Sequence, residues 1–124
     1  MKKTLFTIFI LFFFQIPTLS AHTHMEKEYQ FKWCSLNNGN IEYKLPDSTR
    51  IDCLTSEYAI EFDFASKWAE SVGQSLFYAM STNKKPGIVL IMENPEKDEK
   101  YLKRLQKLAN TYNIKIWTMN SGDI

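Results

Sequence analysis

The sequence is poor in the residues that build metal–thiolate and redox centres. It has two cysteines and two histidines among 124 residues. No second cysteine pair or His-x-x-x-His lies near Cys34 and Cys53, which argues against the common zinc motifs. The two cysteines do not form Cys-x-x-Cys either, so a thiol-redox role is a weak alternative. His22 and His24 could bind a metal at a free amino terminus, but we expect residues 22–27 to form a frayed polar tail.

An excess of charge of either sign is also lacking. The 15 basic and 14 acidic residues give a formal charge of +1, and without Lys2 and Lys3 the basic residues fall to 13, which gives −1. Proteins devoted to coating nucleic acids are typically strongly basic. The composition therefore argues against that class, although a local basic patch remains open. No internal repeat or low-complexity segment is present.

Only one long hydrophobic run occurs, and it lies at the amino terminus. Residues 5–14 follow two lysines, and Pro17 ends the run before small residues lead to Ala21. This pattern predicts a secretory signal peptide over residues 1–21, because the run is shorter than the ~20 residues that span a bilayer. No lipobox cysteine follows. We expect an exported protein, periplasmic or extracellular, without membrane attachment after cleavage, whose residues 22–124 form a single domain.

The even number of cysteines favours a disulfide. In an exported chain, Cys34 and Cys53 are expected to pair with each other. The bond would close a loop of about 20 residues, which is worth roughly 3 kcal/mol in the chain-entropy account.

Hydrophobic periodicity predicts an α/β (α+β) domain with a mixed sheet. The expected elements are a helix over 28–33, strands over 41–45, 50–54 and 57–64, a helix over 65–81, a strand over 88–92, a helix over 95–112 and a strand over 114–117. We expect residues 82–87 to form a Pro-Gly turn and residues 120–124 a loose tail. The order is an αβββαβ core followed by a helix and a strand, with helices flanking the sheet.

The third predicted strand carries two carboxylates on one face. Glu61 and Asp63 are two residues apart, so both point to the same side, while the apolar side chains between them point to the other. Asp52 lies on the preceding strand, and a hairpin would bring it beside them. Carboxylates in one cluster repel each other unless a cation intervenes. Mg²⁺ or Mn²⁺, bound by these carboxylate oxygens, would supply the positive charge that the cluster needs.

The helix after this strand carries a complementary polar stripe. Lys67, Gln74 and Tyr78 are spaced by seven and four residues, so they lie on one side of the helix, with Glu70 close to the same stripe. The first turn should face the carboxylates. Lys67 could then reach a water or a phosphate, while Gln74 and Tyr78 could hydrogen-bond a substrate backbone or base.

This ordered set resembles the PD-(D/E)XK (restriction-endonuclease-like) nuclease superfamily. Asp52, Glu61-x-Asp63, Lys67 and Gln74-x-x-x-Tyr78 on an αβββαβ chain carry the resemblance, which covers about residues 41–92. It implies Mg²⁺ ligation by Asp52 and Glu61, with Asp63 sharing the ion. It also implies hydrolysis of DNA phosphodiesters, with Lys67 activating water and Gln74 and Tyr78 holding the substrate. Asp63 stands where the family has its lysine, a departure that Lys67 could offset.

The sequence supports two functional interpretations. One is a metal-dependent exonuclease or endonuclease, and the other is an inactive nuclease fold that serves as a periplasmic or secreted binding module. Glu61 and Asp63 could also be the solvated face of a half-exposed strand. The charged side of the helix over 95–112, with Lys100 and Lys103, is interpreted as ordinary solvated surface. The pattern does not decide the oligomeric state.

Overall fold

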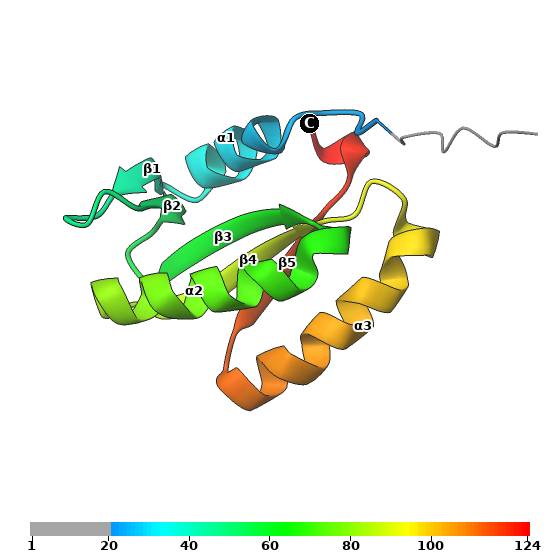
Figure 1. The fold of residues 1–124 in the computed structure, drawn as a ribbon. Coiled ribbons are helices and arrows are strands. Elements are labelled where there is room, and N and C mark those ends of the chain that lie inside the picture. Colours follow the sequence, from blue (N-terminus) through cyan, green and yellow to red (C-terminus); the bar gives the residue numbers. More distant parts are fainter. Residues whose placement is uncertain (1–20) are drawn as a thin grey trace, which may run out of the picture.

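A five-stranded mixed sheet with helices on both faces forms the domain (Figure 1). The computed structural model describes residues 21–124, so the predicted signal peptide lies almost wholly outside the described residues. The predicted fold class is confirmed. No helix in the described range is long and apolar enough to cross a bilayer.

The elements follow the predicted order. They are α1 (Glu26–Leu36), β1 (Asn40–Lys44), β2 (Arg50–Leu54), β3 (Tyr58–Phe64), the 3₁₀ turn η1 (Ala65–Lys67), α2 (Trp68–Thr82), β4 (Lys85–Ile91), α3 (Pro95–Tyr112), β5 (Lys115–Met119) and the 3₁₀ turn η2 (Ser121–Asp123).

The sheet has the spatial order β1-β2-β3-β4-β5. The first three strands form an antiparallel meander, whereas β3, β4 and β5 run parallel and are joined by crossover helices. The β2–β3 ladder is short, with Cys53 paired to Ile60 and Leu54 to Ala59. In contrast, β3 pairs with β4 along its whole length, from Tyr58 to Phe64. The two strands of the short ladder are therefore held by few backbone pairs near Asp52.

Apolar side chains alternate between two covering layers. Phe62 and Ile91 pack with Tyr29 and the two cysteines on the α1 side, while Ile88 and Leu90 pack under α2 and α3 on the other side. Figure 1 shows α1 on one side of the sheet and α2 and α3 on the other. The central strand β4 is thus buried on both faces, as expected for a continuous apolar run in a parallel pair.

The predicted disulfide is present. Cys34 on α1 and Cys53 on β2 form the bond, and both residues are fully buried. Gly39 lies against the bond, and a Cβ atom there would collide with both sulfur atoms. The disulfide therefore fixes α1 to the strand that carries Asp52, the residue beside Cys53.

The Pro-Gly turn predicted over residues 82–87 is wrong in its second half. Asn83 ends α2 in the left-handed conformation, with φ 52°, and Pro86 and Gly87 then belong to β4, paired with Ala59 and Ile60. Pro is tolerated near the start of a strand. Gly87 leaves space for the Trp117 ring, which a Cβ would approach to 2.8 Å. Pairing with β3 therefore outweighs the local preference for a turn.

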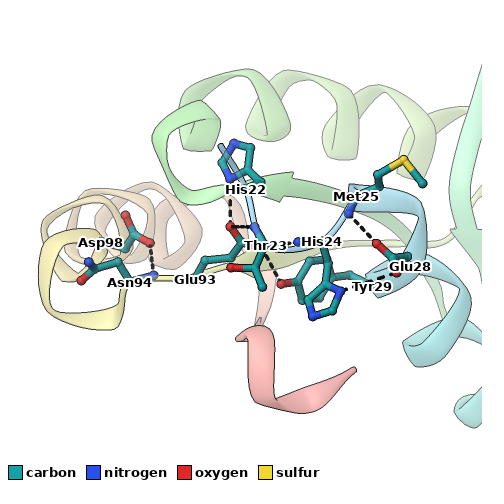
Figure 2. Close-up of polar contacts among 9 residues, drawn as sticks. All are labelled: His22, Thr23, His24, Met25, Glu28, Tyr29, Glu93, Asn94 and Asp98. Carbon is teal, nitrogen blue, oxygen red and sulfur yellow. Dashed lines mark hydrogen bonds and ion pairs between the residues drawn. The ribbon is translucent and has the colours of Figure 1, made fainter. Parts of the chain in front are cut away.

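Residues 22–25 are also ordered, contrary to the frayed tail that the sequence predicts over residues 22–27. Glu93, which follows β4, accepts hydrogen bonds from His22 Nδ1 and from the backbone N–H groups of Thr23 and His24 (Figure 2). It also accepts one from the Tyr29 hydroxyl at 2.8 Å. One partly buried carboxylate thus holds the chain just before α1.

The expected loose tail at the carboxyl terminus is likewise a defined turn. Asn120 accepts a hydrogen bond from the Gly122 N–H, and Asp123 accepts one from the Asn120 N–H at 2.7 Å. These two contacts close η2, because Asn and Asp side chains readily bond nearby backbone groups.

Candidate functional site

The structure brings the predicted catalytic and metal-binding side chains to one cavity of about 210 Å³. We call it the acidic cavity. Its lining residues are Glu26, Asp52, Glu61, Phe62, Asp63, Lys67, Glu70 and Gln74. They come from α1, β2, β3, η1 and α2. Five of the eight are carboxylic acids, so the cavity combines a dense cluster of carboxyl groups with a single lysine.

The cavity opens where β2 and β3 stop pairing. At this point Asp52 Oδ2 accepts a hydrogen bond of 2.8 Å from the Phe62 N–H. The Asp52 side chain thus takes the place of a backbone carbonyl of β2 as the acceptor for this N–H group. Continuing the register of the last two pairs puts Asp52 opposite Glu61. The alternation of β3 therefore places its two carboxylates beside Asp52, as the sequence predicts.

Glu61 is buried without a complete set of hydrogen-bond partners. Its side chain lines the cavity on a residue only 3% exposed, and its Oε1 atom has no partner. Asp63 is also buried, so the β3 carboxylates are not the solvated face of a half-exposed strand. An unsatisfied buried polar atom costs ~1–3 kcal/mol of stability. A ligand in the cavity that contacts this oxygen would remove that cost.

The carboxyl groups hold their protons more tightly than usual. Burial is the largest cause for each, and it raises the pKa of Asp63 to about 7, with Glu26 adding to the rise and Lys67 opposing it. Burial also raises the pKa of Asp52 and, more strongly, that of Glu61, whose carboxyl shares a hydrogen bond with Asp52. A cation in the cavity would lower all three pKa values.

The 3₁₀ turn η1 and the helix α2 together contribute part of the predicted polar stripe. Lys67 and Gln74 line the acidic cavity, and so does Glu70. Tyr78 does not line it. This tyrosine is 7% exposed and packs against Ile51 and Ala59, and burial raises its pKa. The stripe therefore runs from the cavity at its start into the core at its end.

Glu26 is a lining residue that the sequence did not indicate. It begins α1, accepts a hydrogen bond of 3.1 Å from Gln30 Nε2, and has a pKa raised chiefly by burial. The segment looked like a polar tail, and no local pattern connects it to β3. Docking of the preceding segment on Glu93, the packing of Tyr29 in the core and the disulfide at Cys34 bring it to the cavity.

The acidic side chains face one cavity without forming a closed ligand cluster. Within residues 21–124, no three His, Cys, Asp or Glu side chains stand as a group able to hold a metal ion. The arrangement nevertheless offers oxygen donors of the type that Mg²⁺ and Mn²⁺ prefer. The unpartnered Oε1 of Glu61 is the donor that a small cation would satisfy directly.

Comparisons with known proteins found no match for this chain. No family model matches it, and neither a curated protein nor a solved structure is similar to it at a significant level.

Proposed function

We propose that the acidic cavity binds a divalent cation, Mg²⁺ or Mn²⁺, and that the protein hydrolyses phosphodiester bonds of DNA. The observation that carries the proposal is the buried Glu61 carboxyl, whose Oε1 has no partner in a cavity shared with Asp52 and Asp63. The resemblance to PD-(D/E)XK nucleases supports the choice of reaction, since the same residues carry it.

Asp52, Glu61 and Asp63 would hold the ion, which supplies Lewis-acid activation of water and neutralises charge on the phosphate. Asp52 is already oriented by the Phe62 N–H. The acidic cavity of about 210 Å³, which all three carboxyl groups line, leaves room for the ion. The three carboxyl groups must lose their protons to bind it, so occupancy should rise as the pH increases from about 7, the raised pKa of Asp63, towards about 10, the raised pKa of Glu61.

Lys67 and Gln74 act on the substrate in this proposal. The ammonium of Lys67 stabilises the charge that develops on the phosphoryl oxygens, and the Gln74 amide donates to the substrate backbone. The oxygen of water forms a new bond to phosphorus, and the bond to the leaving sugar oxygen breaks. That oxygen takes up one proton, and the second proton of the water passes to solvent. Lys67 replaces the lysine that the resemblance would put at Asp63.

Plasmid DNA incubated with the disulfide-bonded protein and Mg²⁺ or Mn²⁺ tests the reaction. The wild type should nick or linearise the plasmid, and Glu61→Gln and Lys67→Ala should each lower the rate at least a hundredfold, the order of a lost electrostatic contact. Glu57→Gln is the matched control, because this glutamate is exposed and bonded to Lys85. Equal cutting by all four proteins, or none by any, would refute catalysis.

A binding module without hydrolysis is the second candidate. Its motivating observation is the charge of the cavity, in which five carboxylic acids face the single lysine. A polyanion approaching such a site is repelled until cations neutralise it. Ion binding that is lost in Asp52→Asn, together with no cutting of DNA under any ion, would favour this candidate over the nuclease.

A further inference from the structure

A second, larger cavity lies beside the acidic one, on the other side of η1. Its volume is about 400 Å³, and Ala65 and Ser66 of η1 line it, whereas Lys67 lines the acidic cavity. It adjoins the carboxyl ends of β3 and β4, through Phe64 and Ile91. Ligands commonly bind at the carboxyl ends of parallel strands, and this volume is in the range of small-molecule sites.

The carboxylates of this cavity are already engaged. Glu93 accepts four hydrogen bonds, from His22, Thr23, His24 and Tyr29 (Figure 2). Burial would raise the Glu93 pKa, but these bonds outweigh it and the pKa is lowered. Asp98 accepts a bond from the Asn94 N–H, and the Asn94 side chain accepts one from Lys97 N. Both carboxylates remain charged, but their oxygens are turned to these donors, and the charges of Lys97 and Lys100, which line the same cavity, offset theirs.

Two lysines on α3 remain as the positive groups of the cavity wall. Lys97 and Lys100 line it, and among the described residues neither is in an ion pair, whereas Lys103 on the same helix pairs with Glu99 at 2.9 Å. Lys100 Nζ lies 4.9 Å from the centre of the Tyr101 ring, which also lines the cavity. The wall therefore combines unpaired cations with an aromatic ring.

Another part of the lining offers a second aromatic surface. The His22 ring stacks on Phe64, with centroids 3.5 Å apart and planes 13° from parallel. Its side chain is 51% exposed, so the ring face away from Phe64 is left for a planar partner. The bond to Glu93 fixes the orientation of the ring (Figure 2).

We propose that this cavity binds a nucleoside monophosphate unit, with its phosphate at Lys97 and Lys100 and its base against His22. Lysine is a common phosphate ligand, and bases stack on aromatic side chains without regard to sequence. Residues 63–67 connect the two cavities, and four Cα steps span at most about 15 Å. The cavity would then hold a nucleotide next to the phosphodiester in the acidic cavity, a placement that rests on the proposed function.

Titration of the isotopically labelled protein with thymidine 5′-monophosphate, thymidine and inorganic phosphate, followed by NMR in EDTA, tests the proposal. The monophosphate should shift the amide signals of Ser66, Lys97 and Tyr101 and bind at least tenfold more tightly than either fragment. Lys97→Glu/Lys100→Glu should weaken it at least tenfold, and His22→Ala should remove the advantage over inorganic phosphate. The matched control Lys103→Glu/Lys107→Glu, with the same charge change on the same helix, should alter it less than twofold.

The absence of shifts at these amides, equal affinity for inorganic phosphate, or equal weakening by both double variants would overturn the proposal. Because the titration contains no divalent ion, it is independent of catalysis, and Glu61→Gln should bind the monophosphate as the wild type does. Binding without DNA cutting would refute only the nuclease, and cutting without binding would refute only this cavity.

Discussion

Replacing Asp63 by Asn should stabilise the domain at neutral pH and not at acidic pH. Asp63 is buried among other acids, and its pKa is raised from 3.8 to about 7, mainly by burial. A carboxyl with a raised folded-state pKa binds more protons in the native state than in the unfolded state. It therefore lowers stability as the pH rises from about 4 towards about 7, and the loss is complete above that range.

The magnitude follows from the size of the rise. A pKa raised from 3.8 to about 7 corresponds to about 4 kcal/mol. Because water can enter the cavity and screen the charge, we expect about 2 kcal/mol at about pH 8. Asn has nearly the same shape and no charge, so Asp63→Asn should gain this amount there and nothing at about pH 4.

Urea unfolding at several pH values between about 4 and 8, in EDTA to exclude divalent ions, measures this effect. The free energy of unfolding of the wild type should fall across the range, and that of Asp63→Asn should fall less. Glu96→Gln, on the exposed surface of α3, is the control and should follow the wild type. A wild-type curve that is flat or rises between about pH 4 and 7, or a variant parallel to it, would refute the assignment of a costly buried charge.

Three further predictions concern the frame that holds the cavity. Cys34→Ala/Cys53→Ala should lower the free energy of unfolding by roughly 3 kcal/mol in urea, because the lost bond closes a loop of about 20 residues. Gly39→Ala should lower it by ~1–3 kcal/mol, since the new Cβ would collide with both sulfur atoms. Glu93→Gln should increase the hydrogen exchange of the Thr23 amide at least tenfold by weakening its anchor.

Each of these changes has a matched comparison. Gly73→Ala, on α2 with no atom within 4 Å of the added Cβ, should be neutral or stabilising, so a loss equal to that of Gly39→Ala would contradict the steric argument. A reduced wild type as stable as the oxidised one would refute the role of the disulfide. For Glu93→Gln, the comparison is the Asp123 N–H, which donates to the Asn120 carbonyl in η2. Its rate of hydrogen exchange should be the same in the variant as in the wild type.

The sequence was sufficient to predict those parts of the site that depend on short-range periodicity. A two-residue period on β3 puts Glu61 and Asp63 on one face, and a short hairpin brings Asp52 beside them. The position of Lys67 follows because the helix begins directly after the strand. These relations involve neighbouring elements, so local geometry determines them.

The remaining parts depend on contacts between distant residues. Glu26 reaches the cavity because Glu93, about 70 residues away, anchors the segment before α1. Pro86 and Gly87 form a strand because β3 pairs with them and Trp117 needs the space. Tyr78 shares the helical stripe of Lys67, but the end of that stripe is covered by Ile51 and Ala59. Neither composition nor spacing contains this information.

Calorimetric titration of the disulfide-bonded protein with Mn²⁺ tests the central claim most directly, since both candidate functions need a cation in the acidic cavity. At about pH 8 the Asp63 carboxyl is ionised, and the ion must displace the proton of Glu61, whose pKa is raised to about 10. We predict saturable binding with a stoichiometry set by one cavity per chain. Glu61→Gln should weaken it at least tenfold, and Glu57→Gln should leave it unchanged. Wild-type protein that releases no binding heat and keeps its melting temperature in Mn²⁺, or equal binding by Glu61→Gln, would contradict the claim.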